Sequence, residues 1–405
     1  ARSLAGGMAA RYAASAGGYP EARIYATGIR VSAVNAALAN GAAGHGEEVD
    51  GAHVAGGHPG ASIVHACVAM AERQRTTGAQ LIEAVVVGYD IGVRLVEACG
   101  GLFSVKERFR LNSDFLYAFG CAAGAAKLLG LDAPRIGHAM TLVSFNSNAL
   151  ANFYAERRHI SKSLCNGQFA SSGVSAALMA GFGLEGNDDS IGSDYGLLHA
   201  WGDPDRIARF GEGLGETFSV MGANFKFINA GYPIHAAVEA AMNAFQQSGV
   251  PVERIERVRV GMPSAAKRVV DDRTMHNICL QDMMAAALIC NGLSIGSSPF
   301  PAVIEDRRFG ALRSSIELYS SEKLDHDQPN GRGSIVTISA AGQSWSSRVD
   351  APRGHSARGG VTWADLCEKW TEGLPGADHA RIFDFAENLE ELEDISVLLD
   401  AITGR

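Results

Sequence analysis

The feature that most constrains the fold is a succession of segments in which small residues share a helical period with larger apolar ones. Residues 62–75 place Val64, Cys67 and Val68 on one stripe, and residues 170–180 consist largely of alanine and serine. With 48 glycines and only 7% aromatic residues, the chain can build helices whose backbones approach closely. We therefore expect closely packed helices rather than a disordered or fibrous chain.

The sequence pattern changes near residue 225 and changes back near residue 351. Before the first change, helices are expected at residues 32–43, 62–75, 81–97, 115–129, 133–147 and 170–180. Between the changes, helices at 234–247 and 280–290 accompany strands at 254–260, 315–319, 333–339 and 344–349, the last two forming a hairpin. Residues 363–402 return to helix. The sequence thus predicts a mainly α fold, with a large, discontinuous all-helical domain (1–224 and 352–405) and a smaller α/β lid domain (225–351).

Charge and cysteine content restrict the partners. The formal net charge is −9, which argues against nucleic acid or an anionic membrane as the main partner. No run approaches the roughly 20 apolar residues of a membrane helix. The seven cysteines are odd in number and form no CxxC pair, so we expect free thiols in a cytoplasmic protein.

The densest group of reactive side chains lies in the glycine-rich stretch 45–60, which holds three histidines and three carboxylates within fourteen residues. One interpretation is a solvated acidic loop that leads into the next helix. A second is a metal site, for which Glu48, Asp50, His53 and His58 have suitable ligand types but match no compact zinc motif. A third is acid/base catalysis, because a histidine beside carboxylates can exchange protons near neutral pH.

Two further segments carry groups that suit an anionic ligand. Residues 156–162 are rich in cations, including Arg158 and Lys162, although on local grounds an exposed basic loop is the favoured interpretation. Residues 226–235 hold Lys226, Tyr232 and His235 at the apparent domain border, where small-molecule clefts are frequent. No GxxxxGK[ST], GxGxxG or GxSxG motif supports a nucleotide, flavin or serine-hydrolase site.

Together these three segments resemble the MmgE/PrpD family. Glu48-Val49-Asp50-Gly51-Ala52-His53 followed by His58-Pro59 is similar to that family's acidic loop and His-Pro pair. Residues 161–173 resemble its lysine-containing helix, and residues 226–235 resemble its Lys…Tyr-Pro…His segment. Residues 31–45, 69–73, 88–95, 126–132 and 388–395 extend the resemblance, in the expected order, over nearly the whole chain.

The resemblance implies a helical domain with an α/β lid, a homodimer, no metal or organic cofactor, and a pocket between the domains for small di- or tricarboxylates. It also implies that His58 is a catalytic histidine, that Glu48 is an acidic site residue, and that Lys162 and Lys226 face substrate carboxylates. Because the family usually has further helical sequence ahead of the position of Ala1, we expect residues to precede this chain.

Four positions depart from the family pattern. Gly51 replaces an aspartate, Ala52 a threonine, Cys165 a histidine, and Leu111 stands where a further histidine is usual. Next to Leu111, Arg110 could change the charge that the pocket prefers. A chain without that histidine must use another group for its proton step or omit the step.

The favoured hypothesis is a cofactor-independent, dehydratase-like lyase that moves a proton at a carbon alpha to a carboxylate. His58 would be the acid or base, with Glu48 or Asp50 orienting it. His53, His235 and Tyr232 are possible second proton donors, and Lys162, Lys226 and Arg158 would bind carboxylates. The alternatives are an epimerase or decarboxylase acting on a similar carboxylate, and a non-catalytic family member that binds one.

Overall fold

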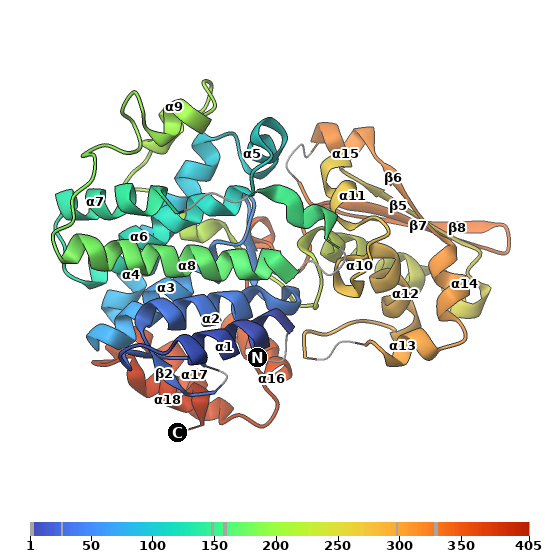
Figure 1. Cartoon of the computed structure of the whole chain (residues 1–405). Coiled ribbons are helices and arrows are strands. Elements are labelled where there is room, and N and C mark those ends of the chain that lie inside the picture. Colours follow the sequence, from blue (N-terminus) through green and yellow to red (C-terminus); the bar gives the residue numbers. More distant parts are fainter. Residues whose placement is uncertain are drawn as a thin grey trace. The chain divides into compact units, whose positions relative to one another are not determined.

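The computed structural model describes residues 4–25, 27–146, 150–156, 160–296, 299–327 and 331–404. The chain forms two compact units, the first made of residues 1–46, 50–223 and 376–405 and the second of residues 47–49 and 224–375. Helices dominate the first unit, and the four-stranded sheet lies in the second (Figure 1). The mainly α fold class with a smaller α/β part is thus confirmed. The sequence-based domain borders at 224/225 and 351/352 stay a prediction.

The first unit is a stack of helices with a continuous apolar core. Its helices are α1 (Leu4–Ala16), α2 (Ala33–His45), α3 (Pro59–Gln74), α4 (Gly78–Ala98), α5 (Leu102–Phe109), α6 (Tyr117–Leu128), α7 (Ala133–Ser144), α8 (Ile160–Gly181), α9 (Leu197–Trp201), α17 (His379–Glu387) and α18 (Ser396–Thr403). Short 3-10 turns are η2 (Ser113–Leu116), η3 (Ala151–Ala155), η4 (Ile207–Phe210), η5 (Ser219–Gly222) and η9 (Leu389–Glu391). Strands β1 (Ala22–Arg23) and β2 (Arg30–Val31) pair antiparallel, and β3 (Gly51–His53) lies in the loop after α2.

Glycines set the spacing between the central helices. A Cβ on Gly167 of α8 would lie 2.3 Å from the carbonyl oxygen of Leu38 in α2. A Cβ on Gly120 of α6 would lie 2.2 Å from the carbonyl oxygen of Gly88 in α4. Neither helix pair could therefore pack at its present distance with a larger residue at these positions. The tight helix contacts expected from the small-residue segments are thus present.

Residues 376–405 return to the first unit and are fixed there by polar contacts. The backbone N–H of Gly78 donates to the carbonyl of Leu392 at 2.8 Å. Arg23 forms ion pairs with the buried Glu72 and with Asp400 in α18. Helices from the two ends of the sequence, drawn in blue and red, therefore share one unit (Figure 1).

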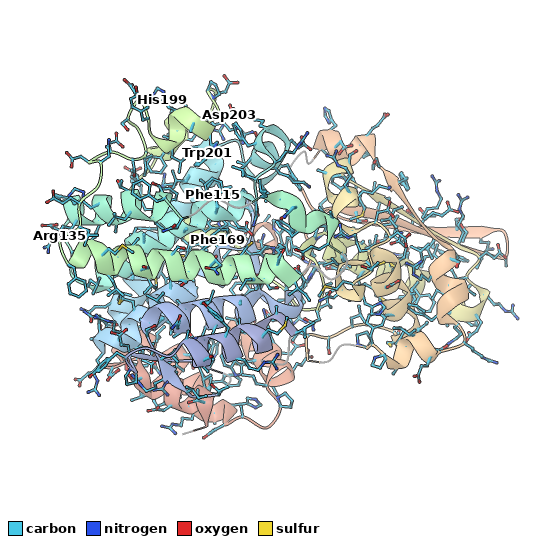
Figure 2. All side chains as sticks on the ribbon, viewed as in Figure 1. Phe115, Arg135, Phe169, His199, Trp201 and Asp203 are labelled. Carbon is cyan, nitrogen blue, oxygen red and sulfur yellow. The ribbon has the colours of Figure 1, made fainter. Side chains whose placement is uncertain are left out.

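Aromatic side chains fasten the long segment after α8 to the core. Trp201 at the end of α9 meets Phe115 edge to face, with ring centroids 4.9 Å apart (Figure 2). Phe115 is fully buried in the core, so this contact anchors a region of turns that has little regular structure of its own.

The second unit packs helices on a four-stranded sheet. Its strands are β5 (Arg257–Met262), β6 (Ile316–Ser320), β7 (Ser334–Ala340) and β8 (Gln343–Val349), in the order β6-β5-β7-β8; β5 and β6 are parallel and the other pairs antiparallel. Its helices are α10 (Tyr232–Ser248), α11 (Ser264–Val270), α12 (Leu280–Cys290), α13 (Ala302–Glu305), α14 (Phe309–Ser314), α15 (Glu322–Asp327) and α16 (Trp363–Gly373). Strand β4 (Ala223–Phe225) leads into the unit, and its 3-10 turns include η6 (Val252–Arg254), η7 (His276–Ile278) and η8 (Ser356–Arg358).

The expected β7–β8 hairpin is present, and its two turn residues, Ala341 and Gly342, both have positive φ. Residues 363–402, expected to return to helix, form three helices, α16, α17 and α18. Pro375 lacks the N–H that a helix needs, and Gly376 has φ 86°, so the chain turns there. None of the described helices is both long and apolar enough to span a membrane.

Candidate active site

The loop between α2 and α3 presents the histidines that the sequence singles out. His45 is the last residue of α2, and His58 precedes α3, whose first residue is Pro59. Gly56 and Gly57 have φ values of 103° and 77°, which disfavour larger residues. The hydroxyl of Tyr117 donates to the carbonyl of Gly56, so α6 holds this loop in place.

One carboxylate connects the two imidazoles. Oδ2 of Asp50 lies 2.9 Å from Nδ1 of His45 and 2.8 Å from Nδ1 of His58. The two rings meet edge to face with centroids 4.3 Å apart. All three side chains are buried. Asp50 therefore orients both rings at once, a role that the sequence analysis assigned to Glu48 or Asp50 for His58 alone.

The surroundings of His58 fix its tautomer. Its Nδ1 faces two acceptors, the Asp50 carboxylate and the Gly51 carbonyl at 2.9 Å, so Nδ1 carries a proton. Its Nε2 lies 3.0 Å from Nζ of Lys162 on α8. In the neutral ring, Nε2 therefore presents a lone pair toward an ammonium group. This carboxylate–imidazole–amine chain can take up a proton at Nε2 while Asp50 stabilises the charge.

A buried hydrogen-bond pair sets the distance between α3 and α8. The hydroxyl of Ser62 donates to Oδ1 of Asn166 at 3.2 Å, and the Asn166 amide nitrogen donates to the Lys162 carbonyl at 3.2 Å. Both side chains are fully buried. Neither this pair nor Tyr117 could be predicted from the sequence, because serine, asparagine and tyrosine give no distinctive signal without the fold.

In the second unit, Lys226 forms a buried ion pair with Glu48. Nζ of Lys226 lies 2.7 Å from Oε2 of Glu48, and neither side chain has appreciable exposure. Glu48 has φ 58°, a conformation that is costly for a residue with a Cβ. The fold therefore brings together two of the predicted site residues, 178 positions apart in the sequence, and the backbone of Glu48 is strained in this arrangement.

The three residues expected as second proton donors are constrained by burial. Both ring nitrogens of His53 bond to the backbone, Nε2 to the Ser219 carbonyl and Nδ1 to the Ala55 N–H, and burial lowers the His53 pKa. His235 donates from Nε2 to the Ala230 carbonyl, and burial, followed by Lys226, lowers its pKa to about 3. Tyr232 is buried, and burial raises its pKa.

The remaining predicted positions differ in their surroundings. Arg110 is exposed and donates to the carbonyl of Glu107 at the end of α5. Beside it, Leu111 forms an isolated β-bridge with Leu150. Cys165 is partly buried, and burial raises the pKa of its thiol to about 11. Arg158 lies outside the described residues.

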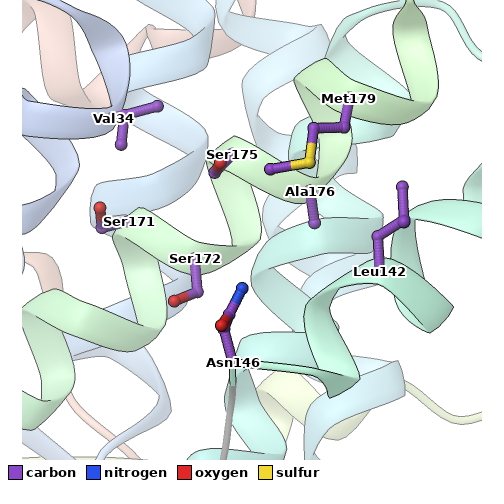
Figure 3. Close-up of a pocket in the computed structure, with 8 residues that line it drawn as sticks. All are labelled: Val34, Leu142, Asn146, Ser171, Ser172, Ser175, Ala176 and Met179. Atoms are coloured by element: carbon purple, nitrogen blue, oxygen red, sulfur yellow. The ribbon is translucent and has the colours of Figure 1, made fainter. Parts of the chain in front are cut away.

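A cavity of about 170 Å³ opens between α2, α7 and α8 (Figure 3). Its lining comprises Val34, Leu142, Asn146, Ser171, Ser172, Ser175, Ala176 and Met179. Asn146 and the three serines can donate and accept hydrogen bonds, the other four side chains are apolar, and none of the eight titrates near neutral pH. The cavity therefore offers polar binding without acid/base chemistry, and none of the predicted site residues lines it.

Among the described residues, His45, Glu48 and His58 each offer a ligand atom of the kind that metals bind, and these atoms lie within 4.8 Å of one another. However, Nδ1 of both imidazoles is directed at the carboxylate, and the Lys162 amine lies against Nε2 of His58. A protonated amine in this position would repel a cation. The arrangement suits proton transfer better than metal ligation.

Comparison with known families agrees with this geometry. Residues 3–210 match the MmgE/PrpD N-terminal domain, and residues 229–390 match the MmgE/PrpD C-terminal domain. The chain belongs to the MmgE/PrpD family. This MmgE/PrpD chain is also similar to human cis-aconitate decarboxylase, with 25% identity over 372 residues, which cover 86% of this chain and 74% of the relative. Family and relative together support a lyase-type enzyme.

Proposed function

We propose that this MmgE/PrpD protein is a cofactor-independent lyase that removes a proton from a carbon alpha to a carboxylate in a small di- or tricarboxylate. The observation that carries the proposal is the Asp50–His58–Lys162 chain of contacts at 2.8 and 3.0 Å. It supplies a base whose tautomer is set, an anion that stabilises the protonated base, and a cation for the substrate.

The proposed reaction begins with an exchange of hydrogen bonds. A substrate carboxylate draws the Lys162 ammonium away from Nε2 of His58, which frees the lone pair of that nitrogen. Nε2 then takes the alpha proton, and the electron pair left behind spreads onto the substrate carboxylate, where Lys162 stabilises the developing charge. Asp50, next to Nδ1, stabilises the imidazolium that forms.

Departure of a β-hydroxyl as water would complete a dehydratase-like elimination, which we favour. Return of a proton to the opposite face after the same first step would be epimerisation. Loss of CO₂, as in the name of the human relative, would use the residues in the other direction: the electron pair of the broken C–C bond stays on the substrate, and a protonated His58 donates a proton to it. The leucine at position 111 favours the epimerase among these alternatives, because epimerisation requires no acid for a leaving group. Lys226, paired with Glu48, is proposed as a further carboxylate-binding residue.

The test is a screen of di- and tricarboxylates, cis-aconitate included, incubated with the protein in D₂O and followed by proton NMR. We expect deuterium at an alpha carbon and a new olefinic product. H58Q should reduce the exchange rate by about 10²–10⁴-fold. K162M should raise KM and lower kcat, whereas K127M, which removes a half-exposed lysine of α6 paired with Glu83, should match the wild type.

Three results would contradict the proposal. Full exchange in H58Q would remove His58 as the base. A ligand that raises Tm but is recovered unlabelled and unchanged would favour the non-catalytic carboxylate-binding alternative. Absence of both exchange and binding for every compound in the screen would contradict the proposal that the substrate is a di- or tricarboxylate.

We also propose that the protein is a homodimer located in the cytoplasm. Large apolar side chains, among them Phe145 and Phe182 with 70% and 83% exposure, stand on the surface of the first unit, where a second copy could cover them. All seven cysteines are free, as in a reducing compartment. Sedimentation equilibrium tests the dimer, and a monomer at micromolar concentration would contradict it. That the second unit acts as a lid stays a prediction.

A further inference from the structure

Three consecutive buried polar side chains of the first unit each have an atom without a partner. Asn112 precedes the 3-10 turn η2, and Ser113 and Asp114 are the first two residues of that turn. All three residues are at most 4% exposed. Nδ2 of Asn112, Oγ of Ser113 and Oδ1 of Asp114 have no hydrogen-bond partner among the described residues. Buried polar atoms are almost always hydrogen-bonded, so three unsatisfied ones in succession indicate that a ligand binds there.

The carboxylate of Asp114 lies against the loop that carries His58. A Cβ on Gly57, the residue before His58, would lie 2.2 Å from Oδ1 of Asp114. A larger residue at position 57 would therefore displace the carboxylate. The Tyr117 hydroxyl lies close to the same point, but it donates its proton to the Gly56 carbonyl. Oδ1 of Asp114 is thus an acceptor beside the histidine loop, and the nearest hydroxyl already has another acceptor.

The charge of Asp114 also reaches α8, the helix that carries Lys162. Cys165 lies one turn after Lys162 on this helix. Burial raises the pKa of the Cys165 thiol, and the negative charge of Asp114 raises that pKa further, whereas the positive charge of Lys162 lowers it. A buried anion and a cation of the same unit therefore act on one side chain, and Lys162 also lies 3.0 Å from Nε2 of His58.

The turn that carries Asp114 is fixed at both ends. Before it, Leu111 forms a β-bridge with Leu150, and after it, Phe115 is fully buried in the core. The backbone N–H of Asp114 donates to Oδ1 of Asn112 at 3.3 Å, which orients the Asn112 amide. Because this turn is held by its neighbours, the Asp114 carboxylate cannot easily turn toward solvent. A donor for its oxygen must therefore come from a bound molecule.

We infer that Asp114, assisted by Asn112 and Ser113, is a specificity-determining residue that accepts a hydrogen bond from a hydroxyl or amino group of the substrate. This inference rests on the proposed function, in which Lys162 binds a carboxylate of the same molecule. A further carboxylate next to Asp114 would be repelled by its charge, and an unsubstituted carbon would leave its oxygen without a donor. The substrate class is therefore a di- or tricarboxylate with a hydroxyl or amino substituent.

The test measures dissociation constants, by isothermal titration calorimetry, for compounds that differ in a single group. L-malate and L-aspartate add a hydroxyl and an amino group, respectively, to succinate, and citrate adds a hydroxyl to tricarballylate. We expect the wild type to bind at least one substituted compound about 10–100-fold more tightly than its unsubstituted counterpart. A preference for malate or citrate identifies a hydroxyl as the donor, and a preference for aspartate identifies an amino group.

D114N removes the charge and keeps the shape of the side chain, so it should reduce this preference to about threefold or less. Succinate and tricarballylate should bind D114N at least as tightly as they bind the wild type, a pattern that a merely structural role would not produce. D114S, with a smaller side chain, is the second variant if D114N does not fold. D132N is the matched control, because Asp132 is an exposed aspartate of the same unit, paired with Arg135, and asparagine caps a helix equally well. Its preference should equal that of the wild type.

Three results would overturn the inference. These are equal affinities within every pair of compounds in the wild type, an unchanged preference in D114N or D114S with wild-type Tm, and absence of binding by all five compounds. Alpha exchange without any preference would overturn this inference alone. Absence of alpha exchange in the wild type, with the preference intact, would instead refute the proposed lyase and leave Asp114 as a ligand-binding residue.

Discussion

Replacement of Lys226 by methionine should destabilise the second unit strongly. The Lys226 ammonium and the Glu48 carboxylate are 2.7 Å apart, and both side chains are almost fully buried. At an effective dielectric constant of 20, two unit charges at this distance attract by about 6 kcal/mol. K226M removes that attraction and leaves a buried carboxylate, a loss that typically costs about 3–5 kcal/mol. For a unit of roughly 150 residues, this corresponds to a decrease in Tm of about 6–20 °C.

The assay is thermal and urea unfolding of K226M, E48Q and the double variant K226M/E48Q. The double variant should be more stable than K226M, because it removes both buried charges of the pair, and the cycle should give a coupling of at least about 2 kcal/mol. R257M is the matched control, since it breaks an exposed ion pair with Glu317 in the same unit and should cost at most about 1 kcal/mol. Additive effects of K226M and E48Q would refute the reasoning, since they would mean that the two charges do not depend on each other.

Three further predictions concern packing, protonation and thiol reactivity. G167A should lower the free energy of unfolding by about 1–3 kcal/mol, because the added Cβ would clash with the Leu38 carbonyl. G310A is the control and should leave the free energy of unfolding unchanged, since the space around its added methyl is open. Similar losses in both variants would contradict this prediction. Burial lowers the pKa of His65 to about 4. Below about pH 6.5, His65 is therefore protonated in the unfolded state but still neutral in the folded state. The free energy of unfolding should therefore fall as the pH is lowered from 6.5 to 4. In H65N the slope of this free energy against pH should be smaller, by up to about 1.4 kcal/mol per pH unit. Urea titrations that give the same slope for H65N and the wild type would refute this. A thiol reagent should label the exposed Cys290 in the fastest phase of the reaction. It should spare the buried Cys67, because burial raises the pKa of that thiol to about 12. A C290S variant that keeps the fastest labelling phase would be inconsistent with the structure.

The sequence predicted most of the fold because the relevant signals are local. Helical periodicity and small residues marked helices such as α3 and α8, and strand alternation marked the β7–β8 hairpin. For residues 363–402 the sequence predicted helix but not the borders of α16, α17 and α18. Amphipathic spacing continues on both sides of Pro375, and only the Pro-Gly pair shows that the chain turns.

The candidate site was predictable only in part, because its chemistry depends on contacts between distant residues. The loop 45–60 identified His58 and Asp50 from composition, and family resemblance pointed to Lys162. The contact of one Asp50 oxygen with both His45 and His58 could not be predicted, because it depends on the path of the loop. Gly56, Gly57 and Tyr117 determine that path.

The return of residues 376–405 to the first unit has a consequence for biosynthesis. Gly78 and Thr76 receive their backbone partners from Leu392 and Ile395, and the buried Arg23 receives one of its carboxylates from Asp400. While a ribosome is still translating the intervening segment, these groups lack the partners that residues 376–405 will supply. The second unit, by contrast, is almost complete once residue 375 has left the exit tunnel. During synthesis the second unit can therefore complete its fold before the first unit can. Chaperones have the longest time to act on the surface of the first unit that α17 and α18 will cover.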